Sequence, residues 1–189
     1  GDLSAERLLL AYSNGIFPWY EPGEEILWWC PKERFVIFPE EIHVSRSIKK
    51  FTKKHLFDFR LNRDFADTMH RCRLKREFEE GTWITDEMEE AYCRLHEEGY
   101  AVSAEVFQDG QLAGGLYGVC LGKCFFGESM FSEMENGSKM ALIALAHLLS
   151  ENRFLFIDCQ FHTKHLESMG GRYISWETYE RLLRLGTAV

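Results

Sequence analysis

The strongest constraint on the fold comes from residues 116–160, which alternate between apolar runs and short polar segments. An apolar, glycine-containing run at 116–125 leads to Gly127 and Glu128, and a second apolar run at 154–157 ends at Asp158. Between them, residues 138–149 have the spacing of an apolar helix. Strand, helix and strand with polar groups at both strand ends is how α/β proteins build a site. A carboxylate at the end of an apolar strand is costly unless it is hydrogen-bonded, so we expect Glu128 and Asp158 to lie in a functional site.

The composition is that of an ordered globular protein. The chain has 189 residues, of which 46% are hydrophobic and 14% aromatic, enough for the core of one domain, or of one domain with a small appendage. No apolar run approaches the roughly 20 residues of a membrane span, and no signal-peptide pattern opens the chain. Gly1 is not an initiator methionine, so we expect that a preceding segment is missing.

The six cysteines lie at scattered positions, without the spacing of a disulfide framework or a zinc knuckle. They predict reduced thiols and a cytoplasmic protein. Cys159 with His162 and His165 could form a metal site or a thiol–imidazole pair, but a free cysteine is more often a small buried hydrophobe. We therefore expect neither a metal nor a cofactor.

Charge is distributed unevenly along the chain, whose net charge is −8. Residues 32–76 hold 13 Lys and Arg and six Asp and Glu, a net charge of +7, and the remainder carries −15. Such asymmetry indicates a basic face for a polyanion and an acidic face for a cationic partner. A pair of solvated basic helices would explain the same composition equally well.

Periodicity, capping residues and turn residues predict a mixed α/β (α+β) protein. The expected helices cover residues 3–14, 45–54, 63–75, 86–98, 138–150, 163–169 and 175–184, and the expected strands cover 57–62, 101–107, 112–119, 123–130, 154–160 and 172–174. Ser4 and Thr85 are expected N-caps. Among the tryptophans, Trp28 and Trp29 are expected to pack inside, and Trp19 to contact a ligand.

Several motifs, in order and almost end to end, resemble one known family. They are Gly15-Ile16-Phe17-Pro18-Trp19-Tyr20, Leu27-Trp28-Trp29, His43-Val44-Ser45-Arg46-Ser47, Glu80-Gly81-Thr82-Trp83-Ile84-Thr85, Gly127-Glu128-Ser129-Met130-Phe131-Ser132 and Ile157-Asp158-Cys159-Gln160, with Gly1-Asp2-Leu3-Ser4 at the start. The sequence is similar to the leucyl/phenylalanyl-tRNA–protein transferases. The resemblance implies a small N-terminal domain at residues 1–33, truncated at its start, and a catalytic domain with the GNAT-like acyltransferase fold at 34–189.

In that family, Leu or Phe, and also Met, moves from the 3′ end of its tRNA to the α-amine of a protein that begins with Arg or Lys, which marks the protein for N-end-rule degradation. The reaction is aminolysis of an activated ester and requires no ATP or metal. The resemblance implies that Gln160 receives the amine and that Asp158 polarises and orients Gln160. Since side chains two apart on a strand share a face, we expect Asp158 to accept a hydrogen bond from the Gln160 amide.

The resemblance also places Glu128 in the site, where its carboxylate would attract an ammonium group. An ion pair of Glu128 with Lys139 or Arg153 would be a purely structural alternative. Two polar residues that merely cap a strand would be the corresponding alternative for Asp158 and Gln160.

The remaining implied residues bind the two substrates. The apolar side-chain pocket would be lined by Leu116, Phe125, Met130, Leu142 and Ile157, and the terminal adenosine would stack on Trp19 and Trp83. The tRNA phosphates would bind Arg46, Lys49, Lys50, Lys53, Lys54, Arg71, Arg73, Lys75 and Arg76. The expected partners are aminoacyl-tRNA and a protein acceptor with N-terminal Arg or Lys. We expect no membrane partner, and we expect the protein to act as a monomer.

Two other classes of protein remain alternatives. An acyl-coenzyme A-dependent N-acyltransferase would bind pyrophosphate at the loop 133–138, where the carboxylates of Glu133 and Glu135 would repel it. A non-catalytic RNA- or peptide-binding module would keep the basic face and the aromatic residues. It would not need Glu128, Asp158 and Gln160 together.

Overall fold

The structure is a computed structural model that describes residues 1–79 and 81–188. Its centre is a seven-stranded sheet in the order β4-β5-β6-β7-β8-β3-β9. The strands are β3 Glu33–Ile37, β4 Phe57–Leu61, β5 Ala101–Gln108, β6 Gln111–Leu121, β7 Cys124–Ser132, β8 Phe156–Gln160 and β9 Arg172–Ser175. Every neighbouring pair is antiparallel except β7 and β8, which are parallel. The predicted mixed α/β class is confirmed.

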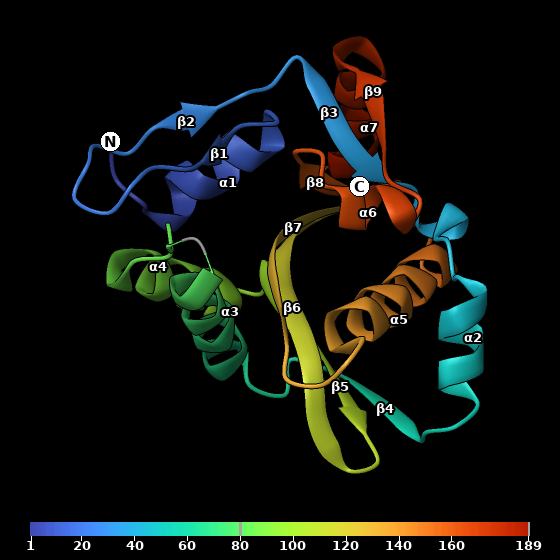
Figure 1. Cartoon of the computed structure of the whole chain (residues 1–189). Coiled ribbons are helices and arrows are strands. Elements are labelled where there is room, and N and C mark those ends of the chain that lie inside the picture. Colours follow the sequence, from blue (N-terminus) through green and yellow to red (C-terminus); the bar gives the residue numbers. More distant parts are fainter. Residues whose placement is uncertain (80, 189) are drawn as a thin grey trace.

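Helices cover both faces of the sheet (Figure 1). They are α1 Ala5–Ser13, α2 Arg46–Thr52, α3 Phe65–Glu79, α4 Asp86–Glu97, α5 Gly137–Glu151, α6 Lys164–Ser168 and α7 Trp176–Thr187. The helices α1, α3, α4 and α7 share one hydrophobic cluster with the sheet, and α2 and α5 share a second cluster on the other face. No helix in the described part of the chain is long and apolar enough to cross a membrane.

The ends of the predicted helices and strands differ from those observed by at most four residues. The side chains of Ser4 and Thr85 cap α1 and α4, as expected. Three strands were not predicted, namely β3 and the short pair β1 Phe17–Pro18 and β2 Trp28–Trp29, together with a single turn of 3-10 helix at Pro39–Glu41. β1 and β2 have two residues each, too few for an alternating pattern.

The sheet divides where β7 and β8 part. The two strands pair only from Cys124 to Phe126 against Phe156 to Asp158, although β7 continues to Ser132 and β8 to Gln160. At the same point β7 contains a bulge, because Tyr117 of β6 pairs with Ser129 and Gly118 pairs with Gly127. The residue left over is Glu128. A bulge bends its strand and redirects a side chain, so the carboxylate is presented where the two strands separate.

A buried ion pair lies at this division, because Asp158 is the last residue of β8 that pairs with β7. Arg34 on β3 is 1% exposed and Asp158 on β8 is fully buried. An Nη1–H of Arg34 donates to Asp158 Oδ2 at 2.6 Å, and the hydroxyl of Tyr179 on α7 donates to the same oxygen at 2.6 Å. Nη2 of Arg34 donates to the carbonyl of Gly15 after α1. One guanidinium and one carboxylate thus connect β3, β8, α7 and the end of α1.

Replacing Arg34 with Met should destabilise the fold severely. The substitution leaves the carboxylate of Asp158 buried without its cation, which typically costs about 3–5 kcal/mol. The free energy of unfolding in urea is the measurement, and the double variant Arg34→Met with Asp158→Asn should recover part of the loss. As a control, Arg184→Gln breaks the exposed pair with Glu180 and should change stability by less than about 0.5 kcal/mol. A loss below 1 kcal/mol for Arg34→Met would contradict the proposed role of this pair.

Candidate active site

A cavity of about 670 Å³ opens where β7 and β8 separate. Its walls come from β1, β6, β7, β8, α3, α5 and α6, and from the segments that follow β1, β8 and α3. The size and the mixture of apolar and polar walls are those of a small-molecule site. Because the gap lies between two strands, the cavity contacts residues of both hydrophobic clusters.

The part of the cavity next to α5 is apolar. All five residues expected to form a side-chain pocket line it, namely Leu116, Phe125, Met130, Leu142 and Ile157. Four of them belong to the hydrophobic cluster on the α5 face, and Met130 packs against that cluster. The structure therefore brings together residues that span 42 positions in the sequence. An apolar recess of this kind can hold an aliphatic or aromatic side chain.

Glu128 lies at the polar side of the same cavity. Its Oε1 accepts a hydrogen bond of 2.5 Å from the hydroxyl of Tyr12 and one of 3.4 Å from Nε2 of Gln160. Tyr12 in turn shares a hydrogen bond with the hydroxyl of Tyr92. Among the described residues, Glu128 forms no ion pair with Lys139 or Arg153. That alternative is wrong because the bulge directs the carboxylate toward α1.

The environment of Glu128 favours its neutral form at physiological pH. Burial raises the pKa of Glu128 to about 8, the hydrogen bond from Tyr12 opposes this shift, and the nearby charge of Asp158 adds to it. Burial also raises the pKa of Tyr12 well above its ordinary value, and the charge of Glu128 adds to this. A carboxyl group with a pKa near 8 can both take and release a proton close to neutral pH.

Asp158 and Gln160 lie two residues apart at the end of β8, but their side chains do not form the expected hydrogen bond. Asp158 Oδ1 accepts a hydrogen bond of 2.8 Å from the backbone N–H of Gln160, whereas the Gln160 amide donates to Glu128. The expected bond between the two side chains is wrong for two reasons. Asp158 Oδ2 is occupied by Arg34 and Tyr179, and Gln160 has a φ of 64°, so β8 leaves its regular pleat before the second side chain.

This arrangement still orients the Gln160 amide. Its NH2 group is directed toward Glu128, so its oxygen remains available to accept a hydrogen bond in the cavity that Gln160 lines. Asp158 acts through the backbone, because its carboxylate holds the left-handed turn that carries Gln160. The sheet therefore presents one amide oxygen and one carboxyl group beside the apolar recess.

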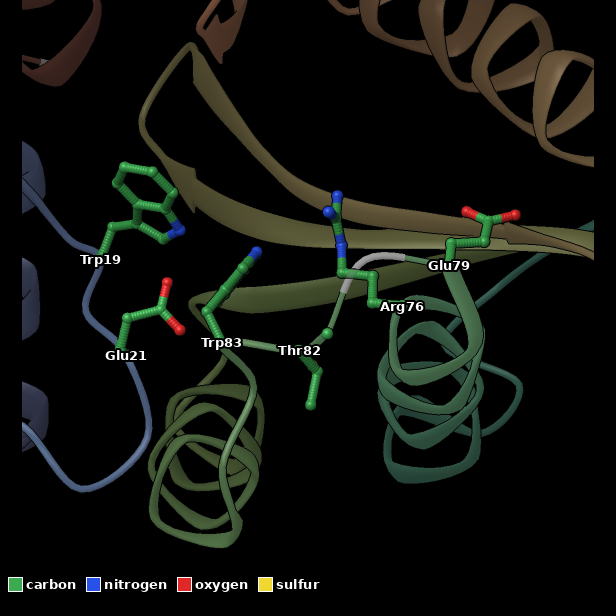
Figure 2. Close-up of a pocket in the computed structure, with 7 residues that line it drawn as sticks. Trp19, Glu21, Arg76, Glu79, Thr82 and Trp83 are labelled. Carbon is green, nitrogen blue, oxygen red and sulfur yellow. The ribbon is translucent and has the colours of Figure 1, made fainter.

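Aromatic residues form the mouth of the cavity. A smaller slot of about 190 Å³ is lined by Trp19, Trp83, Glu21, Glu79, Thr82, Gly81 and Arg76. Figure 2 shows Trp19 and Glu21 on one side, Arg76 and Glu79 on the other, and Trp83 between them. Trp19 is 39% exposed and contacts the rings of Trp29 and Phe161. Trp28 packs against the core as expected, but Trp29 is 38% exposed and supports Trp19 by donating its indole N–H to the Trp19 carbonyl.

The expected nucleic-acid-binding cations differ in their surroundings. The cations on and just after α2, namely Arg46, Lys49, Lys50, Lys53 and Lys54, are exposed. Three of the four cations expected on α3 already have carboxylate partners at the surface, and the fourth, Arg76, is half-buried beside the cavity. Arg71 pairs with Asp67 and Glu133, Arg73 pairs with Glu77, Asp86 and Glu89, and Lys75 pairs with Glu79. The acidic first turn of α4 supplies two of these carboxylates.

The Cys159 thiol does not pair with a histidine. Its sulfur lies 3.7 Å from the carbonyl of Ile157, and burial together with the charge of Asp158 raises its pKa far above the ordinary value. His162 contacts Glu167 instead. Within residues 1–79 and 81–188, no group of three His, Cys, Asp or Glu side chains has the arrangement of a metal site.

Sequence reasoning missed the residues that support the site from a distance. Amphipathic periodicity assigns Tyr12 to the apolar side of α1 and Tyr92 to that of α4, because it treats a tyrosine as apolar. Arg34 was counted only as one charge in a basic region. The one available signal was that a buried tyrosine needs a partner for its hydroxyl. Nothing in the sequence shows that the partner of Tyr12 is 116 residues away.

Comparisons with known proteins point to one family. The family model described as leucyl/phenylalanyl-tRNA protein transferase matches residues 36–184, and the model of its N-terminal domain matches residues 1–32. A protein of this name from Syntrophus aciditrophicus is 57% identical over 97% of this chain and 77% of its own length. Another, from Pseudomonas entomophila, is 50% identical over 93% of this chain and 77% of its own length.

Similarity to solved structures concerns the fold. The structure of L-PGS from Bacillus licheniformis superposes with a TM-score of 0.52 at 11% identity, and the match covers 97% of this chain and 71% of that one. This similarity supports the expected GNAT-like acyltransferase fold. Together, the family models and the identities over most of the chain show that this protein belongs to the leucyl/phenylalanyl-tRNA–protein transferase family.

Proposed function

We propose that this protein transfers Leu, Phe or Met from an aminoacyl-tRNA to the α-amine of a protein that begins with Arg or Lys. The observation that carries the proposal is that the gap between β7 and β8 joins an apolar recess to the carboxyl group of Glu128 and the amide of Gln160. Transfer needs a pocket for the aminoacyl side chain beside groups that receive an amine and its proton. This cavity offers both within one volume.

The donor would occupy the cavity from the aromatic mouth to the apolar recess. Its side chain would enter the recess, and one methylene there changes binding by only about 1–3 kcal/mol, which fits a site that accepts both Leu and Phe. The terminal adenine would stack between Trp19 and Trp83, worth about 1–3 kcal/mol for a base on an aromatic ring. The exposed cations of α2 would bind phosphates of the acceptor stem, and the paired cations of α3 would have to exchange carboxylate partners to do so.

The acceptor amine would approach from the side of Gln160. Its nitrogen attacks the carbonyl carbon of the ester, a C–N bond forms, and the bond from carbon to the 3′ oxygen of the ribose breaks. The amide oxygen of Gln160 accepts a hydrogen bond from the amine, and the Glu128 carboxylate takes the proton that the amine loses. That proton ends on the departing 3′ oxygen, so charge and atoms balance without ATP.

The surroundings of the α5 N-terminus disfavour the acyl-coenzyme A alternative. The helix begins at Gly137 after two carboxylates, Glu133 and Glu135, and the backbone N–H of Ser138 is bonded to the Ser132 hydroxyl. A pyrophosphate there would meet negative charge and a donor that is already used. The non-catalytic alternative gives no reason for the pKa of Glu128 to be raised next to an amide that lines the cavity.

The setting of the reaction follows from its substrates. We propose that the protein acts in the cytoplasm, where aminoacyl-tRNA is available, that it works as a monomer, and that transfer marks its targets for N-end-rule degradation. We also propose residues 1–33 as a small N-terminal domain and 34–189 as the catalytic domain. The separate family models for residues 1–32 and 36–184 support this division.

Transfer itself is tested with leucyl-tRNA and a peptide that begins with Arg. Mass spectrometry should show an increase of one leucine residue, and an acetylated peptide should show none. Gln160→Ala should lower the rate by roughly tenfold or more, because it removes a hydrogen bond to a charged or developing ammonium. The matched control is Gln111→Ala at the exposed first residue of β6, which should leave the rate unchanged. Full activity in the Gln160→Ala variant would contradict the assigned role.

The rate should rise with pH toward about 8, the pKa of Glu128. Below that value Glu128 is protonated and cannot accept a proton, and the acceptor α-amine, with a pKa of about 7.7–8.0, is protonated as well. Between pH 6 and 7, log kcat/KM should therefore rise with a slope near 2. Glu128→Gln should slow transfer by roughly 10²-fold or more and reduce the slope to near 1. A slope near 1 in both proteins would show that Glu128 does not take the proton.

Charge reversal on α2 should weaken tRNA binding in a salt-dependent way. Lys49→Glu with Lys50→Glu removes two cations and adds two anions, and phosphate contacts lose strength as salt screens them. Filter binding should show a loss of roughly tenfold or more at about 50 mM salt and a smaller loss at about 200 mM. The matched control is Arg181→Glu with Arg184→Glu on α7, both exposed, which should change binding little. An equal loss of tRNA affinity in both double variants would contradict a specific role of α2 in tRNA binding.

A further inference from the structure

Arg76 differs from the other cations of α3. Arg71, Arg73 and Lys75 each form ion pairs with carboxylates of the surface. Within residues 1–79 and 81–188, no carboxylate lies in ion-pair range of Arg76. Instead of facing outward, its half-buried side chain lines both the aromatic slot and the main cavity.

Two contacts fix the orientation of its guanidinium. Nε of Arg76 donates a hydrogen bond of 2.9 Å to the hydroxyl of Ser129, which is 6% exposed and follows the bulge in β7. The guanidinium carbon also lies 5.5 Å from the centre of the Trp83 ring. Figure 2 shows Arg76 rising from α3 between Trp83 and Glu79. Since Ser129 uses Nε, the two terminal nitrogens remain available for a ligand.

Such a group suits an anion with two oxygens. A guanidinium fork binds a phosphate through two parallel hydrogen bonds, and the group can remain over the indole as it does so. The carboxylates of Glu21 and Glu79 at the slot oppose an anion, but the charge of Glu79 is offset by Lys75 at 3.1 Å. The bulge at Glu128 thus has a second consequence, because it turns Ser129 toward α3, where it holds Arg76.

We propose that Arg76 binds the phosphate on the 5′ side of the donor's terminal adenosine. The inference rests on the proposed function, in which the adenine lies between Trp19 and Trp83 and the aminoacyl group lies in the apolar recess. Arg76 is adjacent to Trp83 and contributes to both spaces, so it lies where the sugar–phosphate of that nucleotide must pass. Arg76 therefore positions the last nucleotide, whereas the cations of α2 hold the stem.

Binding of AMP and of adenosine to the whole protein tests this assignment directly. Both have the same base and sugar, and only AMP carries the 5′ phosphate. In ligand-observed NMR, the dissociation constant of AMP from wild-type protein should be roughly tenfold lower than that of adenosine. This difference is expected for one charge-assisted contact. Arg76→Gln should weaken AMP binding to the level of adenosine and leave adenosine binding unchanged. Arg76→Lys, which keeps the charge without the fork, should retain only part of the preference.

The matched control is Arg94→Gln, which removes an exposed cation of the neighbouring helix α4, paired with Glu90. It should keep the full preference for AMP, and circular dichroism should show every variant folded. Equal binding of AMP and adenosine by wild-type protein, a preference that survives in Arg76→Gln, or a lack of binding of both nucleotides would overturn the assignment. Because no transfer step enters this measurement, its failure is separate from failure of the peptide assay, which tests the proposed function.

Discussion

The ion pair between Arg34 and Asp158 is the interaction on which the site depends. Both groups are removed from water, where each charge would be costly without the other. Their contacts join the end of α1, β3, β8 and α7, which are far apart in the sequence. The second oxygen of Asp158 then holds the backbone of Gln160. The same carboxylate therefore fixes the packing of four elements and the position of a cavity-lining amide.

The division of the sheet converts this packing into a site. The strands β7 and β8 are paired up to Asp158, and beyond this residue they separate around the cavity. The bulge at Glu128 places two successive side chains, those of Glu128 and Ser129, toward the helices α1 and α3. A regular strand would send them to opposite faces. One extra residue in β7 thus provides both a carboxyl group for the reacting amine and a support for Arg76.

Much of the fold and of the cavity could be predicted from the sequence, since both depend on local patterns. Periodicity located the α5 helix and the strands beside it, and the apolar residues expected to form a pocket line one cavity. The partners of the polar groups could not be predicted, because they come from distant parts of the chain. Asp158 pairs with a residue 124 positions away. No local pattern shows that the Gln160 amide therefore donates its hydrogen bond to Glu128 instead of Asp158. The positive φ of Gln160 was equally invisible, since glutamine does not favour that conformation.

The two acids of the site have different neighbours. Asp158 has a guanidinium in direct contact, whereas Glu128 has only a phenol and an amide as partners. The negative charge of Asp158 reaches Glu128 and adds to the effect of burial, so the pKa of Glu128 rises to about 8. Placing paired acids in unlike environments is a general way to separate a fixed charge from a group that exchanges protons. A carboxylate with a pKa of about 8 is a stronger base than one of ordinary pKa, so it takes the proton that the amine loses during attack at a lower cost.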